Sequence, residues 1–239
     1  KPMVTKPMVT KPMVTKPIFF NIDKINHNTS LKRKMYIANN ILYNPLFSIS
    51  KLSNILYHKC NNINNVLLIG NGSIYNDISN TIQDYDIVVR FNNYISDNPI
   101  ELVGTKTDIH LTCIPNDLDD FNSWDNGCDC IIPLEINFQE RYDKLIKMNK
   151  NSRVIIPDIT FMKNIKNTKC DITRGFFGLL LFLQIKTNKN KNLKINIIGF
   201  GGNGHHYNKD KKIHHDHKNE IVILNELKHN GTITDLNDK

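Results

Sequence analysis

The sequence predicts an α/β protein whose sheet is mostly parallel, and two observations carry this prediction. Short runs of apolar, β-branched residues recur along the chain, and stretches with helical spacing of apolar residues lie between them. Strands of parallel sheets have such continuous apolar sequences because both faces of the sheet are covered. The alternation of strand and helix then indicates a sheet with helices packed on its two faces.

The expected elements follow one another from residue 66 onward. The runs VLLIG (66–70) and DIVVRF (86–91) have the length of buried strands, and FFGLLLFLQ is apolar enough for a buried helix. The same reasoning extends to the other segments. We expect further strands at 108–113, 129–133, 153–157 and 194–200, and helices at 138–150, 175–186 and 217–229.

The chain before this region divides into two segments. Residues 1–20 contain three copies of KPMVT, a low-complexity repeat for which we expect a disordered tail. Residues 21–60 contain apolar residues at helical spacing, as in Met35, Ile37, Ile41 and Leu42, and are interpreted as a stem or accessory helices. Residues 61–239 are then interpreted as one main domain, which contains the expected strands and helices.

Polar and glycine residues follow the first two predicted strands at the point where each strand ends. Asn71, Gly72 and Ser73 follow the first strand, and Asn92 follows the second. Ligands of open α/β sheets bind at the carboxyl ends of the strands, and glycine lets the backbone approach a ligand closely. Asparagine carries a donor and an acceptor without charge, which suits a nucleoside. Tyr75 occupies the third glycine position of the dinucleotide fingerprint, so an NAD enzyme is disfavoured.

Six segments together resemble the four sialyl motifs of the animal-type sialyltransferases and, more distantly, bacterial sialyltransferases. GNG, DYDIVVRFN and VGTKTD resemble the large sialyl motif, and CDITRG before the apolar run resembles the small motif. His205-His206-Tyr207 resembles the third motif, and His215 followed by Glu220 resembles the very small motif. The resemblance covers about residues 61 to 235. It implies a single Rossmann-like domain, a variant of the glycosyltransferase A fold.

The resemblance also implies roles for individual residues. Histidine titrates near neutral pH, so His215 is predicted as the general base, with His206 at the departing phosphate. A helix start attracts anions, and Arg174 stands where the family usually has a small hydroxyl residue. Glu220 is interpreted as structural support. The predicted donor-binding residues are Asn71, Gly72, Ser73, Asn92, Thr173, Arg174, Gly175 and Tyr207.

The function that follows is an inverting transfer of sialic acid from CMP-sialic acid to a glycan hydroxyl, without a cofactor. Asp84-Tyr85-Asp86 has the Asp-x-Asp pattern that binds divalent ions, but it coincides with a strand entry, where it is interpreted as turn and capping chemistry. The clustered histidines lack the H-E-x-x-H spacing of zinc sites. We therefore predict no metal, with Asp117 and Asp119 as the positions to watch.

Composition bears on the partners of the protein. The formal net charge is +8, but the lysines are dispersed among asparagines, with no basic helix or aromatic RNA-binding signature. The expected partners are a nucleotide-sugar donor and a glycan acceptor, and no nucleic acid. Two alternatives stay open: a glycosyltransferase that uses another nucleotide sugar, and a non-catalytic protein that binds nucleotides or nucleic acid.

Localisation is left open by the residues themselves. No run of about 20 apolar residues is present, so we expect membrane attachment only through an anchor upstream of this chain. The resemblance implies the lumenal side of the Golgi membrane. It also implies a disulfide at Cys170, for which Cys60 is a loosely matching partner, and five cysteines leave at least one unpaired.

Overall fold

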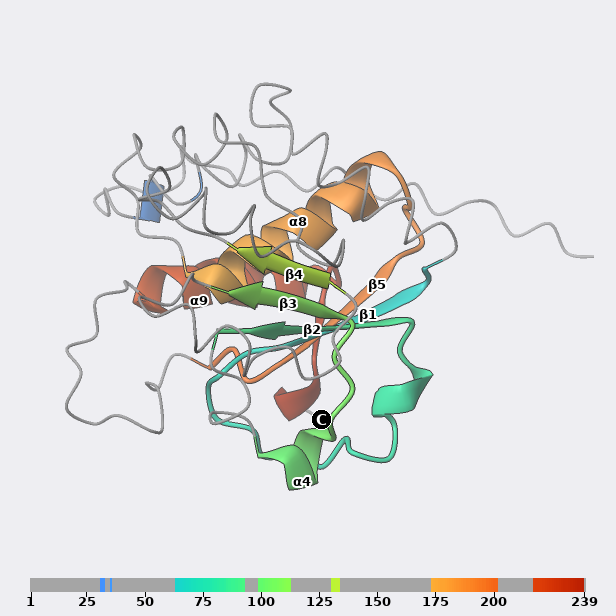
Figure 1. Ribbon diagram of the computed structural model, residues 1–239. Coiled ribbons are helices and arrows are strands. Elements are labelled where there is room, and N and C mark those ends of the chain that lie inside the picture. The colour runs from blue at the N-terminus through green and yellow to red at the C-terminus, as the bar shows by residue number, and fades with distance from the viewer. Residues whose placement is uncertain are drawn as a thin grey trace, which may run out of the picture.

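Six strands form one parallel sheet in the computed structural model of the chain (Figure 1). The structure describes residues 31, 32, 35, 63–92, 99–112, 130–133, 173–201 and 217–238. Within them the sheet has the order β4-β3-β2-β1-β5-β6, and every pairing is parallel. The strands are β1 (Asn65–Ile69), β2 (Ile87–Phe91), β3 (Ile109–Thr112), β4 (Cys130–Pro133), β5 (Lys194–Ile198) and β6 (Thr234–Asp235).

The predicted α/β class with a parallel sheet is confirmed. β1 to β5 fall within two residues of the predicted strand limits. The chain builds the sheet outward from β1 through β2 and β3 to β4, and then returns to place β5 on the other side of β1. Strand order reverses at β1, and such a reversal is where open α/β sheets bind ligands. The strand predicted at 153–157 and the helix predicted at 138–150 lie outside the described residues.

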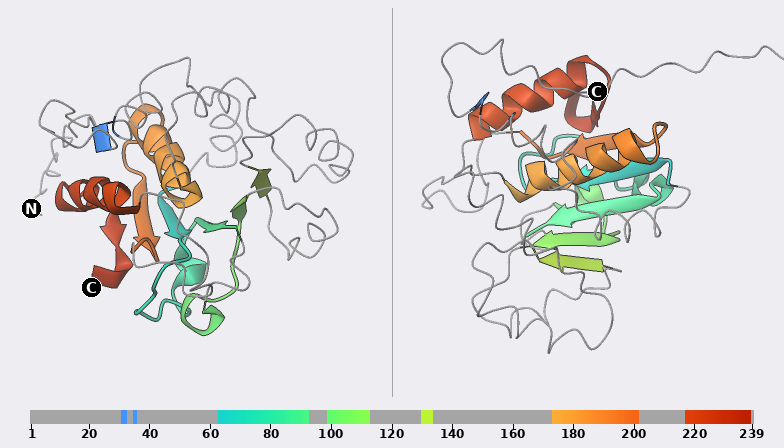
Figure 2. Two further views of the ribbon diagram at one scale, coloured as in Figure 1. Left: turned by 90° about the vertical axis from the view of Figure 1, so that its left-hand side faces the viewer. Right: turned by 90° about the horizontal axis from the view of Figure 1, so that it is seen from above.

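Two long helices cover one face of the sheet (Figure 2). α8 (Arg174–Asn188) extends the predicted helix at both ends, and α9 (His217–His229) has the predicted limits. Apolar residues from both helices pack with Val66 and Leu68 of β1 in one core cluster. Leu31 and Met35, which are helical, belong to the same cluster. Part of the segment before residue 61 therefore contributes to the main core.

Short elements cover the opposite face. They are η3 (Ile82–Asp84), α4 (Ile100–Val103) and η4 (Leu236–Asp238). Each contributes one apolar residue to a second core cluster, which also contains Leu67 and Ile69 of β1. Successive strand residues point to opposite faces, so β1 supplies both clusters. None of the described helices has the length and apolar character needed to cross a membrane.

A buried arginine fixes the segment after α4 against β2. Arg90 is 1% exposed. Its Nε donates to the Lys106 carbonyl at 3.1 Å, and its Nη2 donates to the carbonyls of Val103 and Gly104 at 3.0 and 2.7 Å. Asp108 Oδ2 accepts from the Val88 N–H at 2.7 Å. The DYDIVVRFN and VGTKTD segments therefore form one unit, because a buried guanidinium needs partners for its N–H groups.

Candidate functional site

The carboxyl ends of β1 and β5 meet backbone to backbone. The Gly70 N–H donates to the Ile198 carbonyl and the Gly72 N–H donates to the Gly199 carbonyl, both at 2.8 Å. A Cβ atom on Gly70 would lie 2.4 Å from the Gly199 oxygen, and Gly199 has a φ of 73°. A side chain at either position would force the two segments apart. Gly72, which was predicted to bind the donor, also takes part in this close approach, since a Cβ atom there would lie 2.7 Å from the Gly199 oxygen.

Asn71 connects the ends of β1 and β2. Its Nδ2 donates to the Phe91 carbonyl at 3.1 Å, and the side chain is half-buried. Phe91 is the last residue of β2 and directly precedes Asn92. The contact therefore places the turns that carry Asn71 and Asn92 side by side, as expected for neighbouring parallel strands.

The turn at Asn92 is supported from beneath by a histidine. Asn92 has a φ of 47°, its N–H donates to the Leu111 carbonyl at 3.0 Å, and its carbonyl accepts from His110 Nε2 at 2.7 Å. Burial lowers the pKa of His110 to about 4, although the hydrogen bond to Asn92 acts in the opposite direction. The ring is therefore neutral at pH 7, with its proton on Nε2, since a carbonyl only accepts. His110 was not among the residues predicted for the site.

Phe200 brings the start of α8 to the same place. Its ring contacts Phe91 edge to face, with centroids 5.9 Å apart. A Cβ atom on Gly175 would lie 3.2 Å from Phe200 Cε1, and one on Gly70 would lie 3.1 Å from Phe200 Cδ2. One aromatic ring therefore touches β2, the turn after β1 and the first turn of α8. Phe200 was not among the residues predicted for the site, although an aromatic residue between two glycines at a strand end is a signal that could have indicated it.

The starts of α8 and α9 are joined by a buried carboxylate. Glu220 Oε1 accepts from the Thr173 N–H at 2.8 Å, and Oε2 accepts from Thr173 Oγ1 at 2.7 Å. Thr173 Oγ1 in turn accepts from the Phe176 N–H at 3.1 Å, so Thr173 caps α8. Glu220 is 4% exposed. The predicted structural role of Glu220 is therefore confirmed, and the helix start that it caps is that of α8.

This arrangement changes what the start of α8 offers to a ligand. The N–H groups of Thr173 and Phe176 are used within the protein, and a carboxylate already lies in the positive field of the helix start. Arg174 and Gly175 follow the cap and are partly exposed. A phosphate at this helix end would therefore meet the two residues after Thr173.

The remaining predicted site residues lie outside the described residues. They include the three predicted catalytic and phosphate-contacting residues His206, Tyr207 and His215, together with Asp117, Asp119, Cys60 and Cys170. Their roles stay predictions. Among the described residues, no three His, Cys, Asp or Glu side chains gather as metal ligands would. Asp86 Oδ2 accepts from the N–H groups of Asn64 and Asn65 at 2.7 and 3.0 Å, which is the capping role predicted for it.

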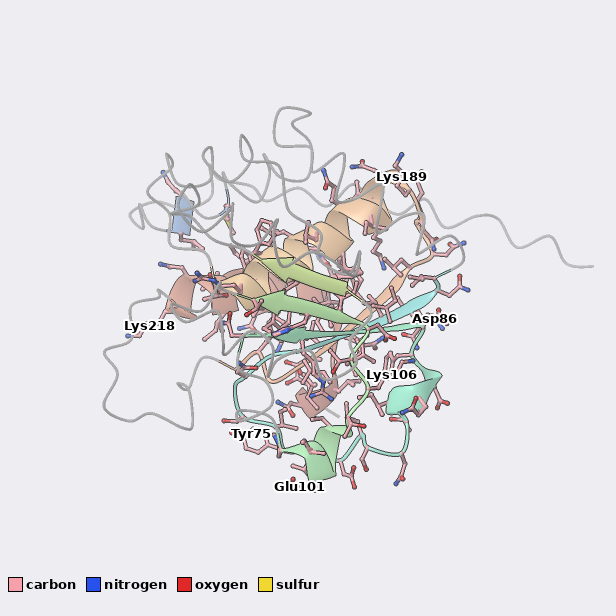
Figure 3. All side chains as sticks on the ribbon, in the orientation of Figure 1. Tyr75, Asp86, Glu101, Lys106, Lys189 and Lys218 are labelled. Atoms are coloured by element: carbon pink, nitrogen blue, oxygen red, sulfur yellow. The ribbon has the colours of Figure 1, made fainter. Side chains whose placement is uncertain are left out.

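The labelled lysines in Figure 3 belong to separate parts of the fold. Lys106 is engaged in the structure, since its Nζ donates to the Tyr85 carbonyl at 2.5 Å and lies 3.9 Å from Asp108 Oδ2. Lys189 follows the end of α8, and Lys218 lies in the first turn of α9; both are exposed. These three lysines are thus separated in the fold, as lysines are separated along the sequence.

Comparison with known proteins identifies the fold. No protein-family model matches the chain, and no curated protein sequence matches it. A crystal structure of a mammalian sialyltransferase in complex with Gal-beta-1-3GalNAc-ortho-nitrophenol is similar, with 15% identity and a TM-score of 0.50 over 90% of this chain and 82% of that chain. A second mammalian sialyltransferase structure has 16% identity and a TM-score of 0.49, with the same coverage. The chain therefore has a Rossmann-like fold similar to that of a mammalian sialyltransferase.

Proposed function

We propose that the protein is a sialyltransferase-type glycosyltransferase. The observation that carries this proposal is the convergence of motif residues from distant parts of the sequence. The turn after β1, the end of β2 and the start of α8 meet around Phe200, at the point where strand order reverses. Shared folds do not by themselves imply shared activity, so the proposal rests on this convergence together with the fold.

The donor in this proposal is CMP-sialic acid. Asn71, Gly72, Ser73 and Asn92 offer amide, hydroxyl and backbone groups to the cytidine, and their position at the carboxyl ends of β1 and β2 supports this role. The phosphate lies toward Arg174 and Gly175, the two residues after the Thr173 cap, with Tyr207 and His206 as further contacts. Positive groups that are already in place stabilise the charge that develops on a departing phosphate.

The proposed reaction needs one general base, which we assign to His215. The base removes the proton of an acceptor hydroxyl, the hydroxyl oxygen attacks the anomeric carbon from the side opposite CMP, and the bond to the phosphate breaks. This displacement inverts the anomeric centre and requires no metal or cofactor. His215 precedes α9 by two residues, and Glu220 holds the first turn of α9 against the start of α8. That contact supports a base close to the donor phosphate.

The proposed acceptor is a glycan hydroxyl. One of the similar structures was solved with Gal-beta-1-3GalNAc-ortho-nitrophenol, which supports a sugar acceptor for this chain as well. The lumenal side of the Golgi membrane is the corresponding proposal for localisation.

Calorimetric titration with CMP and a transfer assay test the proposal together. We expect CMP to bind, and CMP-sialic acid to be consumed in the presence of EDTA while UDP-sugars are not. His215→Ala should lower kcat by about a hundredfold or more with little change in CMP affinity, as the loss of a general base does. His229→Ala, at an exposed histidine at the end of α9, is the matched control.

Three results would contradict parts of this proposal. Absence of CMP binding would overturn the donor, and consumption of a UDP-sugar would point to another glycosyltransferase. Full activity of His215→Ala would overturn the assignment of the base. Salt-dependent RNA binding with no response to CMP would favour a nucleic-acid-binding protein instead.

A further inference from the structure

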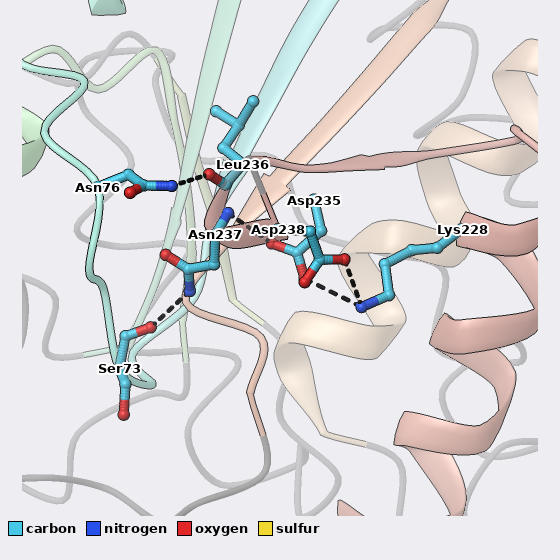
Figure 4. Close-up of polar contacts among 7 residues, drawn as sticks. All are labelled: Ser73, Asn76, Lys228, Asp235, Leu236, Asn237 and Asp238. Carbon is cyan, nitrogen blue, oxygen red and sulfur yellow. Dashed lines mark hydrogen bonds and ion pairs between the residues drawn. The ribbon is translucent and has the colours of Figure 1, made fainter.

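The segment that follows Gly72 is held by a residue from the far end of the chain. Ser73 to Tyr75 form no helix or strand of their own. Asn237 Oδ1 accepts from the Tyr75 N–H at 3.1 Å. Asn237 Nδ2 donates to the Ser73 carbonyl at 2.8 Å (Figure 4). One amide side chain thus engages the backbone at two points, as a neighbouring strand would.

Asn237 is itself fixed from two directions. Its N–H donates to Asp235 Oδ1 at 3.1 Å, and Asp235 belongs to β6, which pairs with β5. Lys228 of α9 contacts Asp235 Oδ2 at 3.4 Å and Asp238 Oδ2 at 2.9 Å. The turn that carries Asn237 is therefore attached to the sheet and to α9.

A second amide crosses the same junction in the opposite direction. Asn76 Nδ2 donates to the carbonyl of Leu236, whose side chain is 6% exposed in the second core cluster. We call the contacts of Asn76 and Asn237 the amide clasp. In the clasp, Asn237 binds the backbone of Ser73 and Tyr75, and the Asn76 side chain binds the backbone of Leu236, so the two contacts together determine where residues 73 to 76 lie.

The clasp acts on the residues that the proposed function assigns to the donor. Gly72 is fixed on one side by its hydrogen bond to the Gly199 carbonyl at 2.8 Å, and Ser73 is fixed on the other side by Asn237. Ser73 is 9% exposed, whereas Tyr75 is 72% exposed and points away from the core (Figure 3). A preformed turn binds a ligand more tightly because less conformational freedom is lost on binding.

We propose that Asn237 is a positioning residue that holds the Gly72–Ser73 turn in the shape that binds the nucleotide. This inference rests on the proposed function, since it takes the ligand of the turn to be CMP. Asn237 acts on the turn through the backbone and does not contact the reacting atoms. Its loss therefore weakens nucleotide binding and leaves the chemical step unchanged.

Asn237→Asp is the sharpest variant. It keeps the shape and the acceptor for Tyr75, but its carboxylate cannot donate to the Ser73 carbonyl and faces that oxygen instead. Asn225→Asp makes the same change at an exposed position of α9 and is the matched control. Asn237→Ala removes both hydrogen bonds without adding charge, and it replaces Asn237→Asp if the latter does not fold.

The test combines CMP titration, steady-state kinetics with CMP-sialic acid, and hydrogen exchange of the Tyr75 amide. We expect Asn237→Asp to weaken CMP binding by about tenfold and to raise the donor KM in proportion, with kcat within about twofold of the wild type. Exchange at Tyr75 should quicken, while exchange in β2 should not change. Asn225→Asp should behave as the wild type.

The outcomes separate this inference from the proposed function. If the wild type binds CMP and Asn237→Asp binds it equally well, the positioning role is overturned. If the wild type does not bind CMP, the proposed function fails, and the assignment of Asn237 to a nucleotide site fails with it. A kcat that falls as far as binding does would also overturn the positioning role.

Discussion

The two halves of the candidate site are held together by opposite means. In the sheet half, Gly70 and Gly199 bring β1 and β5 together through the absence of side chains. In the helix half, Glu220 joins α9 to Thr173 through one buried carboxylate. The sheet half therefore leaves no room for substitution, whereas the helix half depends on hydrogen-bonding groups that a similar side chain can partly replace. Substitutions in each half test this difference.

Gly199→Ala should be the most damaging change in the sheet half. Its Cβ would lie 2.6 Å from the Gly70 oxygen, and the φ of 73° is unfavourable for alanine. Together these effects should lower the free energy of unfolding by about 4 kcal/mol in a urea titration. CMP binding should weaken as well.

Two glycines serve as controls for Gly199. Gly231 has a φ of 71°, and within the described residues nothing lies within 4 Å of its Cβ position, so alanine there should cost only about 1 kcal/mol. Gly201 has neither feature, and alanine should be nearly neutral there. Equal losses for Gly199→Ala and Gly231→Ala would show that the close approach of β1 and β5 does not matter.

His110 should make the stability of the sheet half depend on pH. Burial lowers the pKa of His110 from its ordinary value of 6.5 to about 4 in the folded protein. The unfolded state binds the proton first, so stability is fully present above pH 6.5 and falls as the pH drops toward 4, by at most about 3 kcal/mol. His110→Gln keeps a donor near the Nε2 position and should reduce this slope.

Unfolding titrations of the wild type and His110→Gln at several pH values between 7 and 4 provide the measurement. The difference between the two proteins isolates His110 from the carboxylates that titrate in the same range. Parallel pH profiles would contradict a buried, neutral ring beneath Asn92.

Glu220→Ala should damage the helix half to a smaller degree. It leaves the N–H and Oγ1 of Thr173 without their acceptor at a buried position, which should cost about 2 kcal/mol in thermal or urea unfolding. Glu220→Gln retains one acceptor and should cost less. Glu226→Ala, at an exposed glutamate of the same helix, is the control. If Glu220→Gln were as unstable as Glu220→Ala, the helix half would tolerate substitution no better than Gly70 and Gly199 of the sheet half.

Lys228→Ala should have the smallest effect of the four. Although burial lowers the pKa of Lys228, hydrogen bonds and charges from Asp238 and Asp235 outweigh it and raise that pKa. The ion pairs therefore stabilise the fold below pH 10.5, and their contribution is lost as the pH rises through the raised pKa. Partly exposed pairs contribute under about 1 kcal/mol, which urea titration with and without salt would measure. A larger loss of unfolding free energy would show that α9 and the Thr234–Asp238 segment unfold as one cooperative unit.

Local sequence patterns were sufficient for most of the described fold. The strands β1 and β2 are buried on both faces, and their continuous apolar runs make them recognisable without tertiary information. The limits of α9 followed from its helical spacing. The short elements η3, α4 and η4 were not predicted, because three or four residues carry too little periodicity to be distinguished from connecting turns.

The sequence by itself determined the parallel sheet and the glycine turn after β1, since these depend on residue periodicity and on backbone freedom within a few residues. Only the tertiary structure decided which polar groups support that turn. Glu220 meets Thr173 across 47 positions of the chain, and Asn237 meets Ser73 across 164. Asparagine is abundant in this chain, and every asparagine has the same hydrogen-bonding groups, so nothing local distinguishes Asn237 from the others. The pairing of β6 with β5 and the contacts of α9 bring that residue to the turn, and such proximity is a property of the assembled fold.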